Sequence, residues 1–118
     1  MPTWRTVVTL GCALADVEES TSYGTPALKV SGKLMVRCLE DDERGERIVV
    51  RVESLDERAA MLATAPKTFE VTPHYQNYPW VIVHLAAIER ALLKNVIGDA
   101  WRYAKPKTKA KAKAKNGR

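Results

Sequence analysis

The chain has 118 residues, of which 46% are hydrophobic and 28% are charged, a composition that predicts one soluble globular domain. No apolar run is long enough to span a bilayer, and the stretch from Val7 to Leu10 is too short for a signal peptide, so we expect a cytoplasmic protein without membrane contact. The formal net charge of +5 is unevenly distributed. Residues 102–118 hold eight basic residues and no acid, whereas residues 1–101 hold eleven basic and fourteen acidic residues, a net charge of −3.

Hydrophobic periodicity and turn residues divide the rest of the chain into helices and strands. The predicted elements, in chain order, are a helix over 3–15, a loop over 16–26, strands over 27–31, 33–39 and 47–53, a short helix over 55–65, strands over 69–71 and 80–85, and a helix over 88–104. A tight turn is expected at Ser31-Gly32 and an acidic turn at 40–46. Ser54 and Glu57 form a capping box that starts the short helix, and Pro66 ends it.

This order predicts the α+β class, with an antiparallel sheet covered by helices on one face. Strand alternation assigns an apolar set to the helix-covered face: Leu28, Val30, Leu34, Val36, Ile48, Val50 and Val52. The opposite face then presents a basic set, Lys29, Arg37, Arg47 and Arg51, together with Trp80 and His84. Basic groups with an interleaved aromatic side chain suit a phosphate backbone and a stacked base. The alternative is an ordinary amphipathic strand whose Lys and Arg stems lie over apolar neighbours.

The C-terminal segment is of low complexity, and its Lys-Ala alternation has no apolar face, so we expect residues 105–118 to be a disordered basic tail after a domain of residues 1–104. Such a segment attracts nucleic acid by releasing counterions from phosphates, although a merely solubilising role is the alternative. The tail lysines assigned to this contact are Lys105, Lys107, Lys109, Lys111, Lys113 and Lys115.

Residues 69–84 contain an aromatic segment punctuated by Pro73 and Pro79. With Tyr23, its rings form a candidate pocket whose members are Tyr23, His74, Tyr75, Tyr78 and Trp80. Equally, these rings could seal one end of a small core. We expect no catalytic residue, metal site or cofactor, because no Cys/His cluster, phosphate loop or nucleophile–base pair is present. Both cysteines, Cys12 and Cys38, are predicted to be buried thiols.

Three motifs together resemble the MmcQ/YjbR family of small bacterial proteins: residues 18–34, 72–81 and 100–107. The residues that match the family pattern are Glu19, Tyr23, Gly24, Pro26, Lys33, Thr72, Pro73, His74, Tyr75, Tyr78, Trp80 and Trp101. The resemblance implies a CyaY-like, that is frataxin-like, two-layer sandwich and DNA binding, and it carries over no catalytic residues.

The leading interpretation is therefore a non-enzymatic, monomeric DNA-binding protein of the cytoplasm or nucleoid, with double-stranded DNA as its partner. Phosphate contacts from the tail and the basic sheet face would be largely non-specific. The alternative is a module that binds a small ligand or a protein partner through the aromatic segment 74–80. DNA sequence preference and a physiological trigger leave no mark in the sequence.

Overall fold

The structure, a computed structural model, describes residues 2–39 and 47–105. Helices and strands there follow one another in the order α1, β1 to β4, α2, β5, a short 3-10 helix η1, β6 and α3. Their bounds are α1 Trp4–Cys12, β1 Val17–Ser22, β2 Thr25–Val30, β3 Lys33–Cys38, β4 Arg47–Arg51, α2 Leu55–Thr64, β5 Phe69–Glu70, η1 Pro73–Tyr75, β6 Trp80–His84 and α3 Arg90–Ala104. The predicted acidic turn at 40–46 lies outside the described residues.

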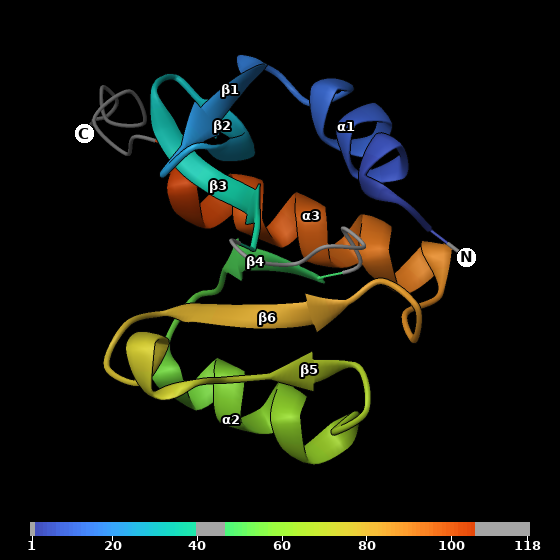
Figure 1. The fold of residues 1–118 in the computed structure, drawn as a ribbon, viewed down its shortest axis with the longest axis vertical. Coiled ribbons are helices and arrows are strands. Elements are labelled where there is room, and N and C mark those ends of the chain that lie inside the picture. Colours follow the sequence, from blue (N-terminus) through green and yellow to red (C-terminus); the bar gives the residue numbers. More distant parts are fainter. Residues whose placement is uncertain (1, 40–46, 106–118) are drawn as a thin grey trace, which may run out of the picture.

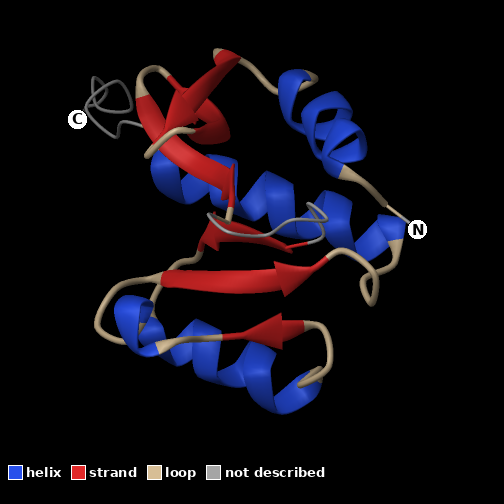
Figure 2. Cartoon of the chain, viewed as in Figure 1, coloured by secondary structure: helices blue, strands red, loops and turns tan. Residues whose placement is uncertain are grey.

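Within these residues the strands form a six-stranded sheet in the order β1-β2-β3-β4-β6-β5, and each neighbouring pair is antiparallel. In Figure 1 the sheet runs from β1 at the top to β5 at the bottom, with α3 behind its middle strands. Figure 2 separates the sheet from the helices by colour. The α+β class predicted from the sequence is therefore confirmed, with one more strand than expected.

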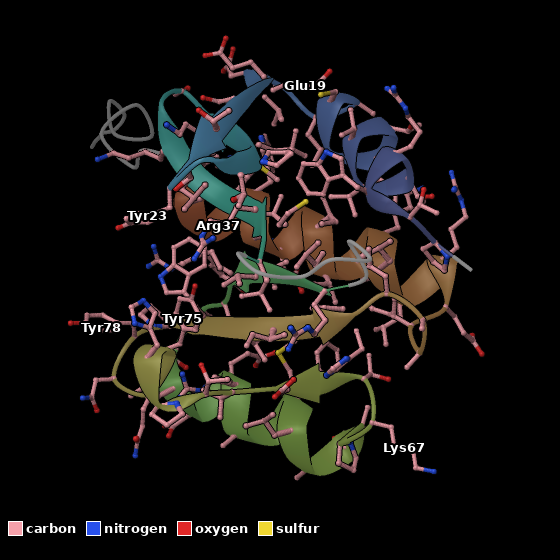
Figure 3. All side chains as sticks on the ribbon, viewed as in Figure 1. Glu19, Tyr23, Arg37, Lys67, Tyr75 and Tyr78 are labelled. Atoms are coloured by element: carbon pink, nitrogen blue, oxygen red, sulfur yellow. The ribbon has the colours of Figure 1, made fainter. Side chains whose placement is uncertain are left out.

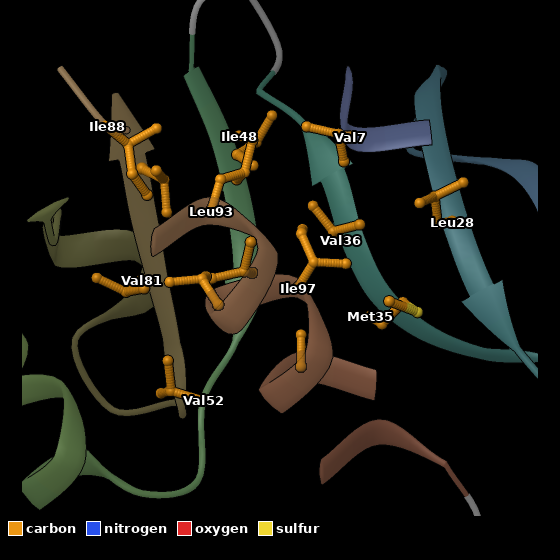
Figure 4. Packing of buried hydrophobic residues seen from close by; sticks show 14 of the residues in the cluster. Val7, Leu28, Met35, Val36, Ile48, Val52, Val81, Ile88, Leu93 and Ile97 are labelled. Carbon is orange, nitrogen blue, oxygen red and sulfur yellow. The ribbon is translucent and has the colours of Figure 1, made fainter. Parts of the chain in front are cut away.

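A core of aliphatic side chains fills the space between the sheet and the helices. Val36 of β3 pairs with Val50 of β4, which pairs with Val81 of β6, so these three valines line the helix-covered face. Leu93 and Ile97 of α3 pack on that face, as Figure 4 shows. Val7 of α1 and Met61 of α2 join the same cluster. All three helices therefore pack on one face of the sheet, and no α-helix covers the other face in the described part of the chain.

The prediction of a loop over residues 16–26 was wrong, because β1 forms the edge of the sheet there. Its strand pairs with β2 from Val17 opposite Val30 to Ser22 opposite Thr25. Acidic and hydroxyl side chains suggested a loop, yet an edge strand tolerates them because most of them face solvent. The turn between β1 and β2 is formed by Tyr23 and Gly24 at φ 54° and 81°, a geometry suited to a two-residue hairpin.

A β-bulge in β3 changes which side chains face the helices. Leu28 pairs with Val36, but the next residue, Lys29, pairs with Leu34, so Met35 is an extra residue without a partner in β2. Both Met35 and Val36 consequently enter the core. Leu34, predicted to face the helices, lies instead on the opposite face, where it lines a pocket.

Local signals placed the remaining elements well. The Ser31-Gly32 turn is confirmed, with φ of 50° and 85° at its two residues. The Glu57 amide donates to the Ser54 Oγ at 3.1 Å, so half of the predicted capping box is present. The last helix begins at Arg90 rather than at residue 88, and Ile88 packs in the core ahead of it.

Candidate functional pocket

A pocket of about 330 Å³ opens on the sheet face that the helices leave uncovered. Its lining combines aromatic rings, two aliphatic side chains and a guanidinium: Tyr23, Leu34, Arg37, Val49, His74, Tyr75, Tyr78 and Trp80. Figure 3 shows Tyr23 and Arg37 on one side of it, and Tyr75 and Tyr78 on the other. The five aromatic residues grouped from the sequence all line this one pocket. Sequence reasoning missed its aliphatic floor, Leu34 and Val49.

Two separate parts of the chain position the aromatic walls, the β1–β2 turn and residues 72–80. Tyr23 stands on the β1–β2 turn and is 79% exposed. The prolines of residues 72–80 shape a 3-10 turn, on which the His74 and Tyr75 rings meet edge-to-face with centroids 4.7 Å apart. Tyr78 follows and is 59% exposed, so its ring is held by the turn rather than by the core. The walls are thus flat groups on short, hydrogen-bonded turns.

Arg37 of β3 is the charged residue that lines the pocket, and it is only 4% exposed. Its Nη1 donates to the Cys38 carbonyl oxygen at 3.0 Å and reaches the Thr25 Oγ1 at 3.5 Å. The Nη2 donates to the Tyr75 hydroxyl oxygen. Its Cζ lies 5.2 Å from the centroid of the Tyr23 ring, within range of a cation–π contact. The expectation of an Arg37 exposed to a phosphate backbone was wrong, because the aromatic segment covers it.

Arg58 of α2 holds the aromatic segment from below and was not recognised in the sequence. Its two terminal nitrogens donate to four backbone carbonyl oxygens, those of Gln76, Tyr75, Tyr78 and Trp80, at 2.7, 2.8, 2.8 and 3.2 Å. The side chain is 7% exposed. One signal was available, because Arg58 lies at helical spacing from Met61, Leu62 and Ala65, which pack against the core. A charge on such a face needs buried acceptors.

The other basic residues of the sheet do not form one exposed surface with Arg37. Arg51 donates its Nε–H to the Val52 carbonyl oxygen at 3.2 Å and lines a hollow between strand and helices. Lys29 is half-buried opposite Leu34, near the pocket, whereas Arg47 is half-buried opposite His84 at the other end of the sheet. We conclude that the basic face predicted from strand alternation is interrupted.

The tail lysines are only partly within the described residues. Lys105 follows α3, and its Nζ lies 4.1 Å from the centroid of the Trp101 ring, a cation–π contact. The five others assigned to nucleic-acid contact lie outside the described residues: Lys107, Lys109, Lys111, Lys113 and Lys115. Their part in binding stays a prediction.

The remaining polar groups stand apart from the pocket. The His84 Nε2 and the Glu70 Oε1 are 2.7 Å apart, at the end of β6 away from Trp80. In residues 2–39 and 47–105, no three His, Cys, Asp or Glu side chains are arranged to hold a metal ion. None of the helices in that part of the chain is long and apolar enough to cross a membrane.

The two cysteines differ from expectation in one respect. Cys38 is buried as predicted, but Cys12, at the end of α1, is exposed because the helix turns this residue away from the core. Partial desolvation and, to a smaller degree, the negative charge of Glu19 raise the pKa of the Cys12 thiol. A raised pKa makes the reactive thiolate scarcer at neutral pH.

Comparison with known proteins places these features in a family context. The profile of a family described as YjbR matches residues 12–103. The chain is 32% identical over 86 residues to the uncharacterized protein Mb2600 of Mycobacterium bovis and equally to the uncharacterized protein Rv2570 of Mycobacterium tuberculosis. Each match covers 73% of this chain and 67% of the mycobacterial protein.

A solved structure has the same fold. Protein DR2400 of Deinococcus radiodurans, which contains a domain named DUF419, superposes with a TM-score of 0.72 at 17% sequence identity. The match covers 86% of this chain and 77% of that one. At this identity the likeness establishes the fold alone.

Proposed function

The chain belongs to the YjbR family, and from that premise we propose that it is a binding protein whose folded body takes a ligand in the aromatic pocket. The observation that carries the proposal is that Tyr23, from the β1–β2 turn, meets Tyr75 and Trp80 of the distant segment 72–80 around the buried Arg37. Flat walls with a few placed polar groups are typical of ligand sites. From the sequence, DNA binding was the leading function and ligand binding the alternative. We now put ligand binding first, because the basic sheet face is interrupted while the pocket residues converge.

Binding without catalysis is part of the proposal. The residues that line the pocket include no Asp, Glu, Ser, Cys or Lys in the described part of the chain. Their polar groups mainly donate hydrogen bonds. They are the hydroxyls of Tyr23, Tyr75 and Tyr78, the indole N–H of Trp80, the imidazole of His74 and the guanidinium of Arg37. Such a set suits the recognition and orientation of a ligand through hydrogen bonds and ring contacts.

The test is a screen of small aromatic compounds by two-dimensional NMR on the full chain labelled with ¹⁵N. Binding compounds should shift the backbone signals of residues 72–80 and the indole signal of Trp80. The indole of Trp101, whose Nε1–H donates to the Ala15 carbonyl oxygen at 2.8 Å away from the pocket, serves as an internal control. Compounds that shift Trp101 and leave Trp80 unchanged would contradict the proposal.

A second candidate function is duplex DNA binding, which is favoured by the charge distribution. The eight basic residues of 102–118 follow a body with net charge −3, so the segment is the cationic part of the molecule. It would give non-specific affinity with a slope of about 0.9 log unit per neutralised phosphate against log salt. On this proposal the protein works as a monomer in the cytoplasm or nucleoid. The implied CyaY-like classification of the fold likewise stays a prediction.

The DNA proposal is tested by measuring duplex affinity against salt for the full chain and for a chain that ends at Ala104. Truncation should weaken binding and flatten the slope, because seven of the cations are removed. Equal affinities at low salt would exclude the segment from DNA binding. The same two chains should bind pocket compounds equally, so the two proposals are separable.

A further inference from the structure

The buried charge of Arg37 points to the chemical class of the pocket's ligand. Arg37 is almost fully buried, and the acceptors of its hydrogen bonds are a carbonyl oxygen and two hydroxyl oxygens, all neutral. Within residues 2–39 and 47–105, no carboxylate forms an ion pair with it. Buried charges in proteins are ordinarily paired, because desolvation of an isolated ion is costly. Among the described residues, the guanidinium is therefore stabilised by dipoles and a ring face, without a counter-charge.

The hydrogen bonds of Arg37 leave some of its N–H groups unused, among them the Nε–H. Nη1 makes two contacts and Nη2 makes one, and the Nε–H has no partner in the described part of the chain. The Nε–H lies on the same edge of the planar group as one of the two Nη2–H groups. Two parallel N–H groups of this kind match the two oxygens of a carboxylate or phosphate.

The side chains that line the pocket favour an aromatic ring as the part of the ligand that bears the anionic group. Tyr23, Tyr78 and Trp80 present flat rings, and Leu34 and Val49 give an apolar floor. A volume of about 330 Å³ admits one ring or a fused pair. No acidic side chain is among the lining residues, so nothing in the described lining repels an anion.

We propose that the pocket binds a small planar anion, an aromatic ring that bears a carboxylate or a phosphate, with its oxygens on the Arg37 guanidinium and its ring against Tyr78 and Trp80. This inference rests on the proposed function and names the ligand class of that site. The ligand supplies the counter-charge that Arg37 lacks, so binding and charge neutralisation are one event. A neutral ring of the same shape gains only the stacking contacts.

Calorimetric titration of the full chain tests this inference with matched probes. Indole-3-carboxylate and its neutral primary amide differ in charge and hardly in shape, and phenyl phosphate and phenol form the corresponding phosphate pair. We expect the anion of at least one pair to bind about 10-fold or more tightly than its neutral partner, a difference of about 1.4 kcal/mol. The pair that shows the larger ratio identifies whether carboxylate or phosphate is preferred.

Variants separate the anion inference from the pocket itself. Arg37→Met should abolish the preference for the anion. Because Arg37 is buried and its loss could unfold the chain, Tyr78→Ala provides a second test at an exposed ring. It should weaken binding of the anion several-fold, whereas Tyr103→Ala, at a half-exposed tyrosine of α3, should not.

The possible failures are distinguishable. Equal binding of the anion and its neutral partner, still sensitive to Tyr78→Ala, would overturn the anion inference and leave the pocket as a binding site. Binding of no probe, or equal affinities for the Tyr78→Ala and Tyr103→Ala chains, would overturn the pocket proposal and the inference together.

Discussion

Arg58 does not line the pocket, but its replacement should disturb the pocket more than that of any other residue outside the lining. Its two terminal nitrogens contact four carbonyl oxygens of residues 75–80, and no other side-chain donor to those oxygens is found in the described part of the chain. Hydrogen bonds from a charged donor contribute about 1.5–3 kcal/mol each. Because Nη1 shares two N–H groups among three oxygens, we count one full bond per nitrogen, which gives about 3–6 kcal/mol. Water can rehydrate the carbonyls beside the exposed Gln76 and Tyr78, so we expect Arg58→Met to cost about 3 kcal/mol. A domain of this size has a free energy of unfolding of about 5–15 kcal/mol, so the loss is measurable.

The assay is urea unfolding followed by far-UV circular dichroism, combined with amide hydrogen exchange of residues 75–80. Arg5→Met is the matched control, because Arg5 is an exposed arginine of α1, and it should change stability by less than about 0.5 kcal/mol. Arg58→Lys should recover little, since one ammonium group does not span four carbonyl oxygens. If Arg58→Met unfolds like the parent chain and its exchange rates at 75–80 are unchanged, the role assigned to Arg58 is refuted.

Three further predictions concern single residues elsewhere. Ser54→Ala should lower the free energy of unfolding by about 1 kcal/mol in urea titrations, because the Glu57 amide loses its cap. Gly32→Ala should cost about 1–2 kcal/mol in the same assay, because φ is +85° and no neighbour obstructs a Cβ, so the loss is of backbone origin. Glu19→Gln should speed the reaction of Cys12 with Ellman's reagent at pH 8, since removing a negative charge lowers the raised pKa and increases the thiolate fraction; an unchanged rate would exclude the Glu19 contribution.

Sequence patterns located the helices and central strands because those elements carry strong local signals. The Ser54 cap, the Ser31-Gly32 turn and the alternation of residues 80–85 each act over a few residues. The edge strand β1 carries no such signal, because its stability comes from pairing with β2 across the Tyr23-Gly24 turn. Its polar composition therefore predicted a loop.

The orientation of pocket residues depended on tertiary structure that no local pattern encodes. The bulge at Met35 moves Leu34 to the pocket face, and a strict period of two cannot anticipate it. Arg37 was assigned to the correct face but was expected to be exposed, because the turn that carries Tyr75 is distant in sequence. The five aromatic residues grouped from the sequence line one pocket, but Arg37, Leu34 and Val49 were not grouped with them.

The central claim is that the buried Arg37 receives the anionic group of a planar ligand. It is tested most directly by following the Arg Nε–H and Trp Nε1–H signals of the ¹⁵N-labelled chain during addition of indole-3-carboxylate and, separately, of its amide. We predict that the carboxylate shifts the signals of Arg37 and Trp80, that the amide leaves Arg37 unshifted, and that Trp4 and Trp101 stay in place throughout. A carboxylate that binds while the Arg37 signal does not move would contradict the account.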